Sequence, residues 1–195
     1  MARIPYVEYE QATEETKQMY KKLENMNGQV VNIYKLLGNH PKALQGLMGL
    51  SLATYRSGEL DPQLAELVYL QTSALNQCHY WIPTHIMLGR SVGLSKEKVE
   101  QLHQWRESSV YSEKERLILE YTEALVKDIR ISDDLYKRVA EIFSPKQIID
   151  ICFTSGISGI INRIHGTFQT EVDELTLNHK FVKESQNAFK VDSNL

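Results

Sequence analysis

The most informative part of this chain is one short segment and an acid upstream of it. The segment reads Cys78-His79-Tyr80-Trp81-Ile82-Pro83-Thr84-His85, and eleven residues separate its cysteine from Glu66. If the two helices that carry these residues pack together, an acid, a thiol and an imidazole are expected to meet. Trp81 stands where a second cysteine would complete a redox pair.

Length and composition define the class of protein. The 195 residues suit one domain, residues 1–195, that buries most of its apolar surface without disulfides. Two cysteines and no signal-peptide pattern indicate a reducing, cytoplasmic setting. A formal charge of -3 with interspersed signs argues against nucleic acid or an anionic membrane as partner. No apolar run reaches the roughly 18 residues that would suggest a membrane span.

Helix signals recur along the whole chain. Asp61-Pro62 reads as an N-cap followed by proline, and Ser112 and Ser144 each begin a capping box. The pattern predicts an all-α fold with a motif core at about 41–129 and a polar tail, about 183–195, that frays. Helices are expected near residues 12–25, 30–38, 41–57, 62–76, 80–92, 95–106, 113–129, 133–143 and 145–170.

Glu66 lies beside a largely apolar stripe on the helix predicted from Pro62. If the side chain is buried, its pKa rises and it becomes suited to donate or relay a proton. The alternative, a solvated helix glutamate, is the commoner situation for this residue type.

Cys78 is expected at or just before the start of the next helix, because Pro83 is best tolerated in a first turn. There the helix dipole would lower the thiol pKa and favour the thiolate. The alternative is a small buried hydrophobe. His85 follows Cys78 by seven residues, on the same face if the helix is continuous, and is the natural proton acceptor near neutral pH. It is equally expected as a polar residue satisfied by backbone or solvent.

The spacing of Glu66, Cys78, position 81 and His85 resembles the signature of the carboxymuconolactone decarboxylase and alkylhydroperoxidase D-like family. That signature reads Glu, eleven residues, Cys, two residues, Cys, three residues, His. Further similarity to the peroxidase-related branch lies in the lead-in Asn76-x-Cys78-x-Tyr80 and in Gly93-Leu94-Ser95, Ile4-Pro5, Val31-Asn32-Ile33-Tyr34 and Ile161-Asn162-Arg163.

The resemblance implies a multi-helical bundle that assembles as a homo-oligomer, with catalytic Cys78, His85 and Glu66. In peroxidase relatives two motif cysteines cycle between dithiol and disulfide, while the glutamate and histidine relay protons. Trp81 replaces the cysteine that attacks the peroxide, and an indole forms neither a sulfenic acid nor a disulfide. The intramolecular cycle is therefore not expected to run as it stands.

Three functions remain open. The first is a thiol-dependent peroxidase in which Cys78 is oxidised by a peroxide and resolved by Cys152 or an external thiol reductant. The second is decarboxylase-like acid-base chemistry on a small organic acid or lactone, carried by His85 and Glu66. The third is a helical oligomer without enzymatic activity.

Several auxiliary residues are weaker candidates. Tyr80 and Trp81 are either pocket walls or core, His165 either lines a pocket or is a polar residue near a helix end, and Cys152 reads most simply as buried. His79 is a candidate modulator of the thiol, but no second ligand pair has zinc spacing, so we expect no metal. No cofactor motif is present. The broad apolar surface of the predicted helix from Pro145 favours oligomerisation.

Overall fold

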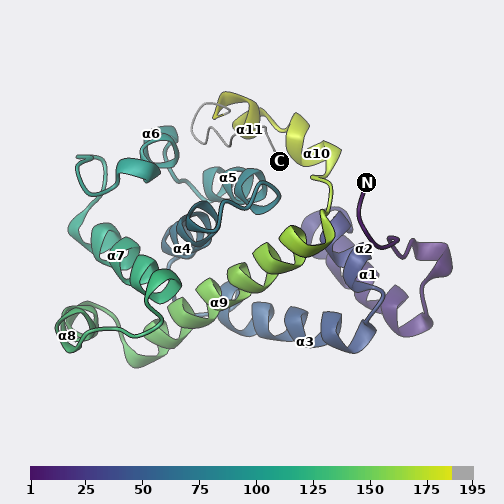
Figure 1. Ribbon diagram of the computed structural model, residues 1–195, viewed down its shortest axis with the longest axis horizontal. Helices are drawn as coiled ribbons and strands as arrows, with labels where there is room; N and C mark the ends of the chain where they lie inside the picture. Colours follow the sequence, from purple (N-terminus) through teal and green to yellow (C-terminus); the bar gives the residue numbers. More distant parts are fainter. Residues whose placement is uncertain (186–195) are drawn as a thin grey trace.

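The computed structural model describes residues 1–185, and within them every regular element is helical (Figure 1). The elements are η1 (Tyr9–Gln11), α1 (Glu14–Asn27), α2 (Asn32–Leu37), α3 (Pro41–Ser51), η2 (Leu52–Arg56), α4 (Pro62–Leu75), α5 (Trp81–Ser91), α6 (Lys96–Glu100), η3 (Leu102–Gln104), α7 (Glu113–Lys127), α8 (Asp133–Ile142), α9 (Pro145–Phe168), α10 (Glu174–Asn178) and α11 (Lys180–Glu184). The predicted all-α multi-helical fold is confirmed.

Helix α4 lies at the centre of the fold. It packs against α5, α7 and α9, and the ten consecutive residues 64–73 are all buried. Its start is fixed by Asp61, whose side chain accepts from the backbone N–H groups of Gln63 and Leu64, with Pro62 in the first helical position. Because α4 is surrounded, each polar side chain on it needs a partner within the protein.

Small polar residues hold α4 against α9. Thr72 pairs with Ser155 and Ser73 with Ser158, each through hydroxyl oxygens 3.0 Å apart. One turn further, the Asn76 amide donates to the Asn162 side chain over 2.9 Å. These hydrogen bonds satisfy polar groups in the helix contact, so the two helices have a defined register.

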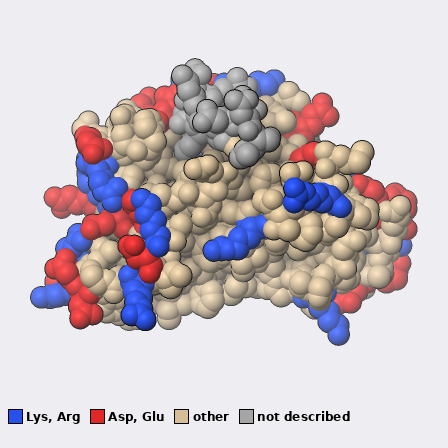
Figure 2. Space-filling model, in the orientation of Figure 1, with Lys and Arg blue, Asp and Glu red and all other residues tan. Residues whose placement is uncertain are grey.

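Helix α9 crosses the front of the molecule (Figure 1), and part of its apolar surface is exposed. Its inner face is buried, whereas Ile149, Phe153 and Ile160 remain 53%, 44% and 44% exposed. In the same orientation, charged side chains gather toward the two ends of the molecule and are sparse across the middle (Figure 2). None of the helices within residues 1–185 has the length and apolarity needed to cross a membrane.

Two sequence predictions need correction. The helix expected over 95–106 is divided, because α6 ends at Glu100 and a 3-10 turn follows. Val99, Leu102 and Trp105 are all buried, and their spacing of three fits the three-residue period of a 3-10 helix better than 3.6. The tail was expected to fray from about 183, yet Lys183 and Glu184 belong to α11 and Ser185 is buried. Residues 186–195 lie outside the described part.

Candidate active site

Glu66 and His85 form a buried pair between α4 and α5. The Nδ1 atom of His85 lies 2.7 Å from Oε2 of Glu66, and each residue is only 1% exposed. The close approach of α5 depends on Gly89, where an added Cβ would lie 2.8 Å from a Leu94 methyl group and 3.4 Å from the Glu66 Cβ. The predicted meeting of acid and imidazole is therefore present in the structure.

Tyr55 completes the surroundings of the carboxylate. Its hydroxyl donates to Oε1 of Glu66, the oxygen that His85 does not use. Burial, followed by the nearby Glu66 carboxylate, raises the pKa of Tyr55 far above its usual value, so the phenol keeps its proton and acts as donor. Tyr55 comes from η2, a π-helical turn that continues α3. Such turns occur often at functional sites.

Aromatic rings hold the imidazole in place. Tyr69 stacks on His85 with ring centroids 3.9 Å apart and planes 7° apart, while Trp81 meets it edge-on at 4.9 Å. The Nε2 atom of His85 is buried and has no hydrogen-bond partner within the described residues. Its Nδ1 is occupied by Glu66, so Nε2 is the ring atom left for a ligand.

A cavity of about 210 Å³ lies against this pair. Its wall includes His85, the tyrosines at 34, 55 and 69, Trp81 and Arg56, and no acidic side chain is among the described lining residues. Glu66 contacts the cavity only through its hydrogen bonds to His85 and Tyr55. The arrangement offers an apolar, aromatic chamber with one cation and one unpartnered imidazole nitrogen.

Cys78 is placed differently from the prediction. It is 2% exposed, belongs to a core cluster with Ile33, Ile157 and Ile161, and is not among the residues that line the cavity. Burial raises the thiol pKa, and hydrogen bonds from the Trp81 amide, the Asn162 side chain and the Tyr80 amide lower it by less. The expected lowering of the pKa is therefore wrong, because desolvation outweighs the helix N-terminus.

The backbone explains why Cys78 and His85 do not share a helix face. Gln77 takes a left-handed conformation, with φ of 51°, which ends the run of α4, and α5 begins only at Trp81. Cys78 thus lies in the connection, although Pro83 falls in the first turn of α5 as predicted. The seven-residue spacing does not correspond to two turns of a continuous helix.

Cys152 is remote from Cys78. It is half-buried on α9, and its sulfur lies 3.4 Å from the Tyr121 hydroxyl. Ten residues of α9 separate it from Asn162, the neighbour of Cys78, a distance of about 15 Å at 1.5 Å per residue. A disulfide requires Cα atoms roughly 4.4–6.8 Å apart. The two cysteines are free, and the fold does not bring them together.

The remaining candidate site residues pack within the fold and are not among the residues that line the cavity. Tyr80 is fully buried, donates to Asp173 over 2.9 Å and accepts from the Ile33 N–H over 3.1 Å. His165 stacks on Tyr80 at 5.5 Å, and burial lowers its pKa. His79 is half-buried and influences His165 electrostatically. Neither histidine lines the cavity, and within residues 1–185 no group of three metal-ligating side chains gathers.

The sequence reasoning did not find Tyr55, Tyr69 or Arg56. Tyr69 lies one turn after Glu66 on α4, but helix periodicity marks it only as core. Tyr55 and Arg56 precede the motif in sequence and reach the site through the packing of η2, which contacts α9 and follows α3. No residue spacing in the sequence predicts that Tyr55 and Arg56 reach the site.

Comparison with known proteins shows which family this chain resembles. Residues 41–124 match the model of the carboxymuconolactone decarboxylase family. A protein of unknown function from Agrobacterium tumefaciens, described as a candidate AhpD-type antioxidant defence protein, is 28% identical. Its structure covers 71% of this chain and 95% of its own, with a TM-score of 0.66. The match over residues 41–124 and these structural similarities support the resemblance of this chain to the carboxymuconolactone decarboxylase and alkylhydroperoxidase D-like family.

Two further relatives extend the comparison. The uncharacterised YdfG protein of Bacillus subtilis is 29% identical over 127 residues, which make up 64% of this chain and 82% of YdfG. An uncharacterised peroxidase-related protein from Ralstonia eutropha shares the fold with a TM-score of 0.81, over 90% of this chain and 94% of its own, at 19% identity. The latter likeness concerns the fold alone.

Proposed function

We propose that this protein is an enzyme that transfers protons on a small organic acid or lactone, with His85 as the base and Glu66 as its orienting partner. The observation that carries the proposal is the buried Glu66–His85 pair, whose Nε2 is unpartnered beside a cavity. Two side chains contact the Glu66 carboxyl group: the Tyr55 hydroxyl donates to Oε1, and Nδ1 of His85 lies 2.7 Å from Oε2. The proposal takes Glu66 as the carboxylate that accepts the Nδ1 proton of His85.

With the proton on Nδ1, the neutral imidazole presents a lone pair at Nε2. This nitrogen takes a proton from the substrate, and the resulting imidazolium is stabilised by the carboxylate behind it. The stacked Tyr69 and the edge-on Trp81 limit rotation of the ring, so the base is oriented before substrate binds. Arg56 supplies a positive charge at the cavity wall for an anionic substrate.

The peroxidase hypothesis makes different demands on the site. It requires the Cys78 thiolate to meet a peroxide, and then a second thiol to resolve the sulfenic acid. The similarity of this chain to the Agrobacterium tumefaciens protein supports the peroxidase hypothesis. Burial of Cys78, its raised pKa and its absence from the cavity lining favour acid-base chemistry instead. Under the peroxidase hypothesis the resolving thiol would be external, since Cys152 is remote.

A paired experiment separates the two hypotheses. Acetoacetate, levulinate and a five-membered lactone carboxylate are incubated with the protein in D₂O, and exchange of the acidic C–H hydrogens is followed by NMR. We expect exchange above the spontaneous rate in wild type and in Cys78→Ser. It should fall at least a hundredfold in His85→Gln and measurably in Glu66→Gln.

The second assay measures peroxide consumption with dithiothreitol as reductant. If the protein performs acid-base chemistry, wild type should consume peroxide no faster than Cys78→Ser. Consumption that depends on Cys78, together with no C–H exchange across the panel, would support the peroxidase and contradict the proposal. If wild type shows neither C–H exchange nor peroxide consumption, and replacement of Glu66 or His85 changes neither measurement, the result would favour a non-enzymatic oligomer.

A further inference from the structure

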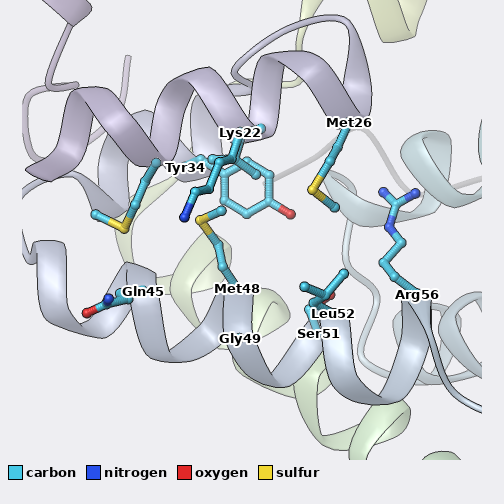
Figure 3. A pocket seen from close by; sticks show the side chains of 11 residues that line it. Lys22, Met26, Tyr34, Gln45, Met48, Gly49, Ser51, Leu52 and Arg56 are labelled. Carbon is cyan, nitrogen blue, oxygen red and sulfur yellow. The ribbon is translucent and has the colours of Figure 1, made fainter.

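A second cavity adjoins the one beside His85. It has a volume of about 220 Å³ and lies between α1 and α3 (Figure 3). The figure shows side chains from the two helices pointing toward each other across it, with the Tyr34 ring between them. Five of its eleven described lining residues have flexible apolar side chains, namely Met19, Leu23, Met26, Met48 and Leu52.

The two cavities share part of their walls. Met26, Tyr34, Ser51 and Arg56 line both. Because the same four side chains line both cavities, the cavities are neighbours. We call them the two arms of an elongated site, with His85 in the wall of one arm and Met19 and Met48 in the wall of the other, the methionine arm. Methionine adapts its shape to an apolar ligand more readily than branched residues do.

The charges around this elongated site have one sign. Lys22 lines the methionine arm, Arg56 lines both arms, and the described lining residues include no aspartate or glutamate. The Arg56 guanidinium carbon lies 5.1 Å from the centre of the Tyr55 ring. Arg56 also lowers the pKa of Tyr34 and Tyr69 against the larger rise caused by burial, so its charge acts where the two arms meet.

We propose that the methionine arm and its junction with the His85 arm bind a carboxylate with an unbranched apolar chain, the carboxylate at Arg56 and the chain among the methionines. A guanidinium presents a planar pair of donors that matches a carboxylate. The apolar arm then buries the chain. Binding of this ligand does not require the Glu66–His85 chemistry, so the proposal goes beyond the proposed function and stands apart from it.

Calorimetric titration with hexanoate, octanoate and decanoate, each below its micelle concentration, tests the proposal on the full chain. We expect saturable binding whose affinity rises by up to about fourfold per methylene, the ratio that corresponds to burial of one CH₂. Neutral 1-octanol should bind at least tenfold more weakly than octanoate. The same titration on Tyr136→Phe, at an exposed position that lines neither cavity, should be unchanged.

Two variants, each of which removes one positive charge, test where the ligand carboxylate binds. Arg56→Met should weaken octanoate binding at least tenfold, while Lys22→Met, at the arm away from the junction, should weaken it less than threefold. Met48→Gln should reduce the gain per methylene and leave hexanoate binding nearly unchanged. Circular dichroism checks that each variant folds.

Three results would overturn the proposal: no saturable binding of decanoate, equal losses in the Arg56 and Lys22 variants, or octanol binding as tight as octanoate. Failure of the proposed function has a different signature. In that case the carboxylates bind as described, but no variant or wild-type protein exchanges substrate hydrogens.

Discussion

Trp81 meets the imidazole of His85 edge-on, with ring centroids 4.9 Å apart and planes inclined by 69°. Trp81, at the position of the second cysteine in the signature that this sequence resembles, thus contacts the imidazole of the Glu66–His85 pair. Trp81 also stacks on Tyr80 at 5.5 Å. Trp81 therefore supplies part of the cavity wall.

Replacement of Trp81 should be costly to stability. The side chain is 6% exposed, and Trp81→Ala leaves a cavity between Tyr80 and His85. We expect the free energy of unfolding to fall by about 3–5 kcal/mol. Trp81→Phe, which keeps an aromatic ring, should cost clearly less. Urea unfolding followed by circular dichroism measures both, and an equal loss in the two variants would contradict a packing role.

Tyr55→Phe should destabilise the fold through Glu66. Without the phenol, Oε1 of a buried carboxylate loses its donor, and a buried unsatisfied group costs about 1–3 kcal/mol. Tyr136→Phe is a suitable control because Tyr136 is 52% exposed, and it should change stability by less than about 0.5 kcal/mol. Thermal unfolding of both variants would show the difference. Similar melting temperatures would mean that water replaces the Tyr55 hydroxyl.

The raised pKa of Cys78 predicts slow alkylation. In Cys152→Ser, where Cys78 is the remaining thiol, reaction with iodoacetamide at pH 7.5 should be at least tenfold slower than for free cysteine. Cys78→Ser, in which Cys152 is the remaining thiol, gives the alkylation rate of Cys152 for comparison. Peptide mass spectrometry over time measures both rates. Alkylation of Cys78 as fast as free cysteine would contradict the raised pKa.

The same shift predicts a loss of stability at alkaline pH. The unfolded chain loses the Cys78 proton near pH 8.5, whereas the folded chain keeps it to higher pH. Between these two pKa values the unfolded state binds fewer protons, so stability falls as pH rises above about 8.5. Cys78→Ala should remove this part of the pH dependence, which urea titrations between pH 7 and 10 would reveal.

The exposed apolar stripe of α9 supports the proposal that the protein is a homo-oligomer. Ile149, Phe153 and Ile160 lie on one face, and contiguous apolar surface of this kind often marks an interface. Light scattering should give a mass above the 22.5 kDa of one chain, and Phe153→Glu should lower it. Ile142→Glu, at an exposed position on α8, is the control. A monomeric wild type would contradict the proposal.

Local signals predicted most of the helices because they act over a few residues. Ser112 and Ser144 form the predicted capping boxes, and Asp61 caps α4 as expected. The prediction was incomplete where long-range packing decides the outcome. The end of α3 continues as a π-helical turn, and α10 and α11 pack against α5 after a segment with no strong helix signal.

The candidate site also has a part that the sequence predicted and a part that only the tertiary structure decided. The sequence predicted that Glu66 and His85 lie on successive helices and meet if those helices pack together, and the packing of α5 against α4 brings them into contact. The sequence also determined that position 81 holds no thiol. Only the tertiary structure decided that Cys78 is buried with a raised pKa, because its desolvation comes from Ile33, Ile157 and Ile161 on distant elements. Only packing, likewise, brought Tyr55 to Glu66 and Arg56 to the cavity, since those contacts depend on how η2 is held against the core.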